Sequence, residues 1–371
     1  MTYRSRVIML EVSIILFLFS ILPPYYLFIS SKKLPNAEPD INNPNIPKLT
    51  ILLPVRNEIK NIERKINEIL LLFLDKDAKL IIIDSNSRDS TAINAKNILL
   101  KAKTNIQWKI ISTELIGKSK AINSVIDSID TPWFIMFDAD ASVSDSSLNY
   151  IFRWMQDPSC GAVCGSQKIV DSNSAYRKRF KLIRKAETFF DSATIFEGSI
   201  CAVRLKALNG NKLVDCMNAD DTQFALMVKR NGYRAIFESR AFFTDQEPLN
   251  LRYSLRRSIR RSQGLLRVLW LNRDLMSLNS RFGRYYANSL YFYVLFPWFF
   301  LISMIFLIHN SIPIMLMSND ILLPLSILSS IIILFKLSFI LSFFNGLLSL
   351  IIAQISLFLG IKYNSWIPER K

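Results

Sequence analysis

The sequence predicts an α/β domain flanked on both sides by apolar, membrane-spanning helices. Three observations lead to this prediction. Short apolar strands alternate with helical patterns in the middle of the chain, apolar stretches of spanning length occur at both ends, and half of the 371 residues are hydrophobic. A mean hydropathy of +0.23 also favours a chain with membrane segments over a purely soluble protein.

Residues 1–30 are interpreted as an N-terminal transmembrane anchor. Residues 7–29 are almost wholly apolar, and about 20 such residues span a bilayer as a helix. A cleaved signal peptide is the alternative, but the stretch is long, its cleavage pattern is poor, and Lys32 and Lys33 follow directly. Residues 31–48, rich in proline and asparagine, are predicted to form an extended linker.

A folded domain is predicted over residues 49–284. Short apolar runs at residues 49–54, 80–83 and 133–137 read as buried strands, and residues 62–74 have helical periodicity. This alternation favours a largely parallel sheet, in which ligands bind at the carboxyl ends of the strands. Polar side chains follow each strand there, which predicts a nucleotide site: Arg56, Asn57 and Glu58, then Asp84, then Asp138 and Asp140.

Residues 285–361 are predicted to form a C-terminal transmembrane region. Three apolar stretches, residues 285–308, 321–335 and 337–361, carry very few charges. The first and last are long enough to span a bilayer and the middle one is short, so two or three helices are expected. A basic tail, residues 362–371, follows.

The net charge of +16 suits nucleic acid, an anionic membrane or an anionic substrate. Residues 176–185, YRKRFKLIRK, place cations and apolar residues at helical spacing, which is typical of a helix on anionic lipid headgroups. The chain has no nucleic-acid-binding motif, and its apolar flanks already account for membrane contact. We therefore expect membrane lipids and no nucleic acid as partners.

The metal chemistry is expected to use oxygen ligands. The four cysteines include no CxxC pair, and the single histidine, His309, lies in an apolar stretch far from them. A zinc site and a Cys–His nucleophile both need these residue types together. Both are therefore disfavoured.

Residues 134–140, FIMFDAD, form a hydrophobic strand that ends in the two carboxylates Asp138 and Asp140. Such a pair can hold a divalent cation that bridges a diphosphate, although a solvated turn gives the same pattern. Six further segments make the context more specific: TILLPVRNE, IIIDSNSRDST, GKSKAIN, IFEGSICAVR, ADDTQFALMVKRNGYR and RSIRRSQG. In this order they resemble the motifs of membrane-bound glycosyltransferases of family 2 over residues 49–267.

The resemblance implies a GT-A-like, Rossmann-related mixed sheet and inverting transfer from a nucleotide sugar to a lipid-linked or glycan acceptor. It implies Asp221 as the catalytic base and Mn²⁺ or Mg²⁺ held by Asp138 and Asp140. The implied donor-binding residues are Glu58, Asp84, Lys118, Asp138, Arg257 and Arg260. The implied acceptor-side residues are Gly198, Ser199, Asp220, Arg261 and Gln263. An integral, multi-pass membrane protein with a cytosolic catalytic domain is expected, because nucleotide sugars are made in the cytosol.

Three positions depart from the family pattern. Ser85 replaces the second aspartate of the base-reading element, Arg261 replaces the tryptophan of the last motif, and Asp220 replaces a glutamate. The first makes the donor base less certain, and the second weakens any claim of a long polysaccharide product. The third leaves both Asp220 and Asp221 as possible bases.

Other interpretations remain open at this point. Asp220 can be a helix N-cap, and the arginines 256, 257, 260 and 261 can be a solvated or lipid-facing basic face. A nucleotidyltransferase on a similar sheet is disfavoured because the first strand is not followed by a glycine-rich loop. A non-catalytic scaffold is disfavoured because the carboxylates are retained.

Overall fold

The structure, a computed structural model, describes residues 3–31, 34–41, 45–168, 175–215, 218–245, 251–318 and 337–363. The predicted short span at residues 321–335, most of the basic tail and Cys216 lie outside these residues. The described chain divides into two compact units. One is built from the described residues of 1–34, 169–183 and 273–361, and the other from those of 35–168, 184–272 and 362–371.

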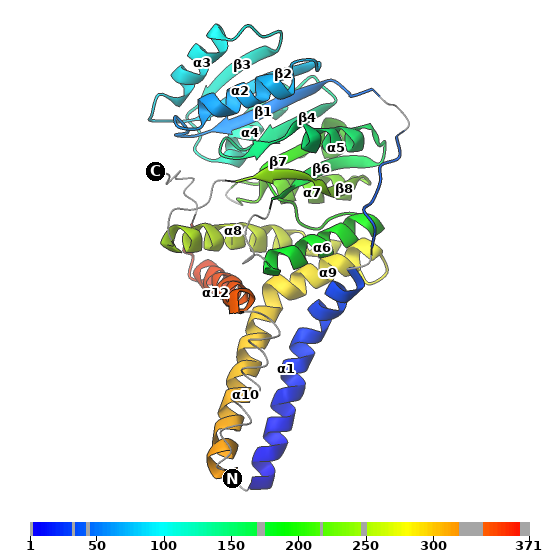
Figure 1. Ribbon diagram of the computed structural model, residues 1–371, viewed down its shortest axis with the longest axis vertical. Coiled ribbons are helices and arrows are strands. Elements are labelled where there is room, and N and C mark those ends of the chain that lie inside the picture. Colours follow the sequence, from blue (N-terminus) through cyan, green and yellow to red (C-terminus); the bar gives the residue numbers. More distant parts are fainter. Residues whose placement is uncertain are drawn as a thin grey trace. The chain divides into compact units, whose positions relative to one another are not determined.

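An eight-stranded sheet forms the centre of the second unit (Figure 1). Its strands are β1 Leu49–Val55, β2 Ala78–Ser85, β3 Gln107–Thr113, β4 Trp133–Phe137, β5 Ser142–Val143, β6 Cys160–Gln167, β7 Ile200–Arg204 and β8 Arg234–Thr244. They are arranged in the order β3-β2-β1-β4-β7-β6-β8-β5. The first four are mutually parallel, β7 is antiparallel to both of its neighbours, and β6 pairs in parallel with β8. This confirms the mixed sheet.

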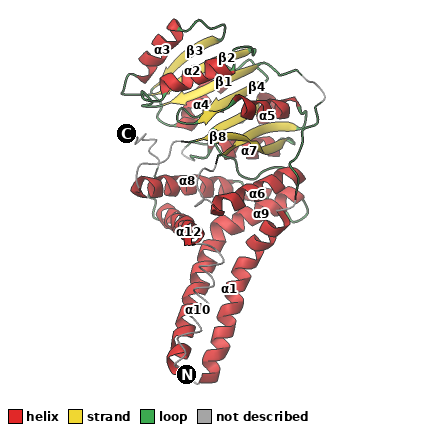
Figure 2. Ribbon diagram, in the orientation of Figure 1, coloured by secondary structure: helices red, strands yellow, loops and turns green. Residues whose placement is uncertain are grey.

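Helices cover both faces of the sheet (Figure 2). They are α2 Ile62–Leu72, α3 Thr91–Lys101, α4 Lys118–Ile126, α5 Asp145–Gln156 and α7 Asp220–Arg230. Ile51 and Leu53 of β1 pack in one apolar cluster with α2, α3 and α5, whereas Leu52 packs in the other with α4 and α7. Because both faces are buried, the central strands are apolar without alternation, which is why sequence detects them.

The predicted strands and helix occur with boundaries that differ by at most two residues. The edge strand β3 was not predicted. Its side chains alternate between exposed and half-buried, so it lacks an apolar run. Strands β6, β7 and β8 were also missed, and with them the antiparallel pairings that complete the sheet.

The remaining helices of the described residues are α1 Tyr3–Ser31, α6 Ala175–Phe190, α8 Leu251–Leu271, α9 Arg281–Leu290, α10 Phe296–Ser318 and α12 Leu337–Phe358. These residues also include a π-helical turn, η4 Tyr291–Leu295, and the 3₁₀ turns η2 Leu205–Leu208 and η3 Arg273–Leu275. In the first unit α1 and α10 lie side by side (Figure 1). The rings of Phe17 and Phe300 are 5.5 Å apart, and Asn310 Nδ2 donates a hydrogen bond to Ser13 Oγ at 3.1 Å. Interhelical polar contacts of this kind are common between membrane helices.

Two described helical segments are long and apolar enough to cross a membrane by length and composition. They are Arg281–Ile312, with 32 residues, and Ile340–Phe358, with 19. The described apolar run in the N-terminal helix, Ile8–Leu22, is shorter. Membrane association is thus supported at the C-terminal end, and the N-terminal anchor stays a prediction.

The basic run at residues 176–185 lies in α6, as its spacing predicts. The ring of Phe180 packs on those of Phe292 and Tyr293, at 5.2 and 6.1 Å between centroids. Arg184 forms an ion pair with Glu197. Phe180 and Arg184 of this basic run therefore contact other parts of the protein. The lipid contact of the run stays a prediction.

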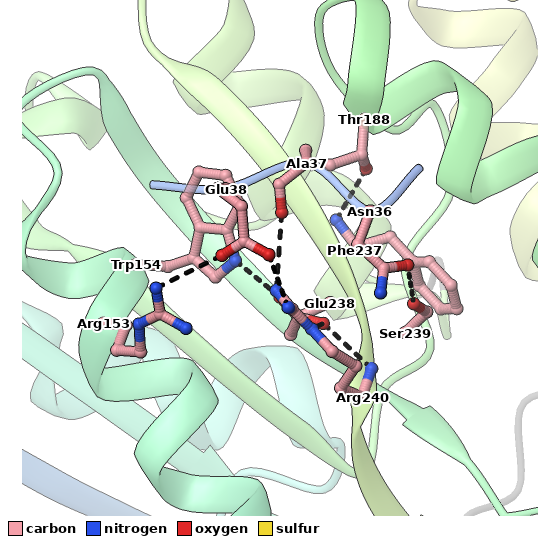
Figure 3. Close-up of polar contacts among 10 residues, drawn as sticks. All are labelled: Asn36, Ala37, Glu38, Arg153, Trp154, Thr188, Phe237, Glu238, Ser239 and Arg240. Carbon is pink, nitrogen blue, oxygen red and sulfur yellow. Dashed lines mark hydrogen bonds and ion pairs between the residues drawn. The ribbon is translucent and has the colours of Figure 1, made fainter. Parts of the chain in front are cut away.

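The linker that follows α1 lies against α5 and β8 (Figure 3). Glu38 pairs with Arg153 at 3.2 Å and with Arg240 at 2.6 Å. Ser239 Oγ donates to Asn36 Oδ1 at 3.2 Å. The extended segment predicted from its prolines is thus fixed by side-chain contacts to the sheet domain.

Arg240 lies between two carboxylates of unequal burial. Its Nε and Nη2 donate to Glu238, each at 2.8 Å, and Trp154 Nε1 donates to the same carboxylate at 2.8 Å. Glu238 is 3% exposed, whereas the side chain of Glu38 is 52% exposed. The hydrogen bond from Arg240 is the main reason that the pKa of Glu38 is lowered.

We expect Glu238→Gln to lower the free energy of unfolding by about 1–3 kcal/mol, because it weakens charge-assisted bonds to the half-buried Arg240 and the buried Trp154. Glu38→Gln should cost at most about 1 kcal/mol, because exposed pairs are screened. The lowered pKa of Glu38 adds stability at neutral pH that is lost in acid, so the Glu38→Gln difference should vanish there. Thermal melts followed by tryptophan fluorescence test the ranking, and equal effects at neutral pH would contradict it.

Candidate active site

An ion pair links the end of β4 to the start of α4. Lys118 Nζ donates to Asp138 Oδ1 at 2.7 Å. Burial alone would raise the pKa of Asp138, but the charges of Lys118, Arg261 and Arg257 lower it. Burial alone would lower the pKa of Lys118, yet the surrounding carboxylates, chiefly that of Asp138, raise it. Both groups are therefore ionised at neutral pH.

Asp220 is buried at the first position of α7 and accepts a hydrogen bond from Ser119 Oγ. The N-cap of α7 is Ala219, and it makes no side-chain capping bond. The interpretation of Asp220 as an N-cap is therefore wrong, because its carboxylate turns toward α4. Burial raises the pKa of Asp220, although Lys118 and Ser119 act against the increase.

Asp221 lies beside the loop that precedes β7. A Cβ built on Gly198 would stand 3.0 Å from Asp221 Oδ2, so only glycine leaves the carboxylate its present place. Burial raises the pKa of Asp221 to about 6, against the hydrogen bond from the Thr222 N–H and the charge of Lys118. The carboxyl group thus titrates near neutral pH.

A carboxylate that the sequence analysis did not single out, Asp245, follows β8 directly. Ser199 Oγ donates to Asp245 Oδ1 at 2.7 Å, and Asp245 Oδ2 lies 3.2 Å from Arg257 and 3.6 Å from Arg261. The side chain of Asp245 is 4% exposed. Ser199 also accepts at its carbonyl from the N–H of Asp138.

The arginines of α8 add positive charge beside these carboxylates. The neighbouring charge of Arg261, with burial, lowers the pKa of Arg257 to about 10, while Asp245 and Asp140 act in the opposite direction. Arg260 also lowers it. Arg257 contacts Asp245 and is 27% exposed, so for it the solvated or lipid-facing interpretation is wrong. Arg261 also contacts Asp245, but its side chain is 51% exposed, which agrees with a solvated position.

The ends of β1 and β2 form a second polar group at the same edge of the sheet. Asp84 is buried and accepts a hydrogen bond from Ser87 Oγ. Glu58 accepts from Asn61 Nδ2 at 2.8 Å at the start of α2. Arg56 carries a buried Nε that has no hydrogen-bond partner within the described chain.

Two polar residues make structural contacts that motif reading did not predict. Ser85 Oγ donates to the carbonyl of Leu115 at 2.6 Å and accepts from the N–H of Gly117 at 3.2 Å. Gln263, predicted on the acceptor side, is fully buried, and its Oε1 accepts from the N–H of Tyr363 at 3.0 Å. This contact ties α8 to the segment after α12 rather than to the carboxylates.

A divalent metal fits the carboxylates that follow β4. Among the described residues no group of three or more His, Cys, Asp or Glu side chains could hold a metal alone. Mg²⁺ and similar cations are commonly held by one or two carboxylates and substrate phosphates. Asp138, ionised, and Asp140, 9% exposed, can provide that partial set of oxygen ligands.

Two family models match the chain. One, described as Glycosyl transferase family 2, matches residues 50–212, and the other, described as Glycosyl transferase family group 2, matches residues 133–353. The second match covers more than half of the chain. The chain belongs to glycosyltransferase family 2. It is therefore a glycosyltransferase of family 2, which favours sugar transfer over the nucleotidyltransferase and scaffold alternatives.

The chain is similar to two bacterial proteins over part of their length. The chain is 26% identical over 245 residues to the poly-β-1,6-N-acetyl-D-glucosamine synthase of Staphylococcus aureus, covering 63% of this chain and 58% of that protein. It is 26% identical over 224 residues to a probable glycosyltransferase of Bacillus subtilis, covering 56% and 52%. The chain thus spans a little over half the length of these relatives.

A solved family-like structure shares the fold. It is a mannosyltransferase from Pyrobaculum calidifontis in complex with GDP-Man and Mn²⁺, with a TM-score of 0.78 and 20% identity over 94% of this chain and 98% of that chain. At this identity the likeness shows the fold alone. It confirms the GT-A-like sheet domain.

Sequence reasoning missed Asp245 because no family motif contains it. The available signal was its position directly after a strand, which Asp138 shares. Strand β8 was not predicted, so this signal could not be used. Of the predicted site residues, Lys118, Asp138, Ser199, Arg257 and Arg261 are brought into contact or charge interaction around Asp138 and Asp245.

We expect Asp221→Asn not to lower stability at pH 7. The pKa of Asp221 is raised from 3.8 to about 6, so the ionised form penalises the folded state above both values, and the penalty fades as the pH falls toward 4. Asparagine removes it. Melting temperatures of wild type and variant at pH 7 and pH 4.5 test this, and a variant that is less stable at pH 7 would contradict the burial of an ionised Asp221.

Proposed function

We propose that this enzyme is a membrane-bound, divalent-metal-dependent, inverting glycosyltransferase that acts on a lipid-linked or glycan acceptor. The observation that carries the proposal is the convergence of Lys118, Asp138, Asp221 and Arg257 from four different elements. The charges of Lys118 and Arg257 act on Asp138, and those of Lys118 and Asp138 act on Asp221. The site thus combines cations, which can stabilise the leaving diphosphate, with a carboxylate, which can take the proton of the acceptor hydroxyl.

Asp221 is the proposed general base. It takes the proton of the acceptor hydroxyl while that oxygen bonds to the anomeric carbon, and the bond from this carbon to the diphosphate breaks with the electron pair leaving on the diphosphate. A general base works best when its pKa lies near the working pH. Burial gives Asp221 a pKa of about 6, and Gly198 leaves room beside its carboxylate.

Lys118, Arg257 and Arg260 are the proposed cations of the donor side. Lys118 and Arg257 lie close enough to Asp138 to lower its pKa, so a diphosphate beside Asp138 would lie within their field. A divalent cation bound by Asp138 and Asp140 would further offset the charge of the leaving diphosphate. Asp84 and Arg56, at the same edge of the sheet, are the proposed contacts of the nucleoside.

The membrane placement rests on sequence. The basic residues Lys32, Lys33, Arg281 and Arg284 flank the apolar segments, and the positive-inside rule then puts the sheet domain in the cytosol. The curated relative is a polysaccharide synthase, which suits a glycan acceptor, and the membrane segments suit a lipid-linked one. Arg261, in place of the aromatic residue of the family motif, argues against proposing a long polysaccharide product.

Metal-dependent nucleotide binding tests the donor site. The purified full-length protein is titrated with UDP and with GDP, with and without Mn²⁺, after a panel of nucleotide sugars has been screened for release of nucleoside diphosphate. Asp140→Asn should weaken the Mn²⁺-dependent binding roughly 10- to 100-fold, because it removes a charged metal ligand. Asp145→Asn, a nearby acidic residue at the start of α5, is the matched control. Equal affinities of wild type and Asp140→Asn would remove Asp140 from the metal site.

Turnover tests the base. Asp221→Asn should lower kcat by roughly 10²- to 10⁴-fold and leave the affinity for the donor nearly unchanged. The wild-type rate should rise with pH through about 6, because the base must be ionised. If Asp220→Asn abolished transfer while Asp221→Asn stayed near wild type, Asp220 would be the base. Full activity of both variants would remove the base from α7.

A further inference from the structure

Asp245 is a buried carboxylate with three partners from two separate parts of the chain. Ser199 precedes β7, whereas Arg257 and Arg261 lie on α8, and all three contact the carboxylate within 3.6 Å. We propose that Asp245 is a positioning residue that sets the guanidinium groups of Arg257 and Arg261 against the carboxylates after β4. This inference rests on the proposed role of Arg257 in holding the diphosphate.

The contacts form a continuous connection from β4 to α8. The N–H of Asp138 donates to the carbonyl of Ser199 at 3.2 Å, and Ser199 Oγ donates to Asp245 at 2.7 Å. Asp245 then accepts from Arg257 at 3.2 Å. The position of Arg257 relative to Asp138 is therefore fixed through two intervening residues, each with its own hydrogen bond.

Solvent exposure distinguishes Asp245, which positions the arginines, from the arginines, which can bind a ligand. The Asp245 side chain is 4% exposed, whereas those of Arg257 and Arg261 are 27% and 51% exposed. Asp245 is therefore screened from a ligand, and the arginines can reach one. Guanidinium groups bind phosphate oxygens through charge-assisted hydrogen bonds.

The charge balance at Asp245 differs from that of a purely structural clamp in the same strand. In this clamp the two carboxylates Glu238 and Glu38 are matched by two cations, Arg240 and Arg153 (Figure 3). Asp245, by contrast, is one carboxylate that contacts two cations. Two guanidinium groups repel each other, and a buried anion between them offsets this while their outer sides stay positive. Such an arrangement suits an anionic ligand.

The test is a double-mutant cycle on the full-length enzyme, with the nucleotide sugar that wild type turns over fastest. Asp245→Asn keeps the shape of the side chain but removes the charge. We expect kcat to fall roughly 10- to 100-fold, as for a reacting group displaced by about 1 Å. The donor KM should change less than about threefold, since no cation is lost. In the Arg257→Ala, Arg261→Ala background the same replacement should cost no further activity, because it acts through the arginines.

Glu238→Gln is the matched control, since Glu238 is equally buried on β8 and also binds an arginine. It should lower the melting temperature without changing kcat. Ser199→Ala, which removes the hydrogen bond to Asp245 from the other side, should lower kcat less than Asp245→Asn and only when the arginines are present. It serves as the second variant should Asp245→Asn fail to fold.

The proposal is overturned if the replacement at Asp245, or at Ser199, lowers kcat equally with and without the two arginines, or lowers it no more than Glu238→Gln does. A different result would contradict the proposed function itself. Wild-type turnover of the Arg257→Ala, Arg261→Ala variant alone would remove the arginines from the reaction. Loss of turnover in that variant, with an unaffected Asp245→Asn, would overturn only the positioning role.

Discussion

Buried carboxylates at one edge of the sheet are the constraint on which the rest of this site depends. An ionised carboxylate inside a protein is costly unless a cation or hydrogen-bond donors accompany it. Lys118 meets this need for Asp138, which it contacts at 2.7 Å. It acts only at longer range on Asp221. Two half-buried carboxylates therefore behave in opposite ways: the pKa of Asp138 is lowered, and that of Asp221 rises to about 6. One carboxylate stays ionised as a metal ligand must, and the other titrates where a base is useful.

The antiparallel pairing of β4 with β7 brings these groups together. Its last strand pair is Phe137 with Ile200, and the bond from the N–H of Asp138 to the carbonyl of Ser199 continues the pairing by one step. This places Gly198 and Ser199 beside the first carboxylate of the metal pair. Gly198 then admits the carboxylate of Asp221, and Ser199 reaches Asp245. A parallel sheet alone would supply Asp84 and Asp138, whereas the reversed strand adds contacts to α7 and α8.

How much of this could be read from sequence depends on burial and distance along the chain. Strands β1, β2 and β4 are buried on both faces, so their apolar runs predict them and the polar residues that follow. Strand β3 lies at the edge of the sheet and its side chains alternate in exposure, and Asp245, which follows β8, lies outside the quoted motifs. The pairing of Ser119 with Asp220 joins positions about 100 residues apart, and no local pattern reports it. Gln263 lies in a motif, yet its bond to Tyr363 depends on how distant segments meet.

The departures from the family pattern have different physical meanings in this chain. Ser85, in place of a carboxylate, bonds to the backbone of Leu115 and Gly117 and so fixes the loop that leads into α4. A carboxylate there could not donate to the Leu115 carbonyl without being protonated, so this contact needs the serine hydroxyl. Arg261, by contrast, adds a charge to the site. Where the motif has an aromatic ring, it adds a charge that lowers the pKa of Arg257 and of Asp138 and needs Asp245 as its partner. Asp245, a carboxylate outside the quoted motifs, therefore balances a cation that lies inside one of them.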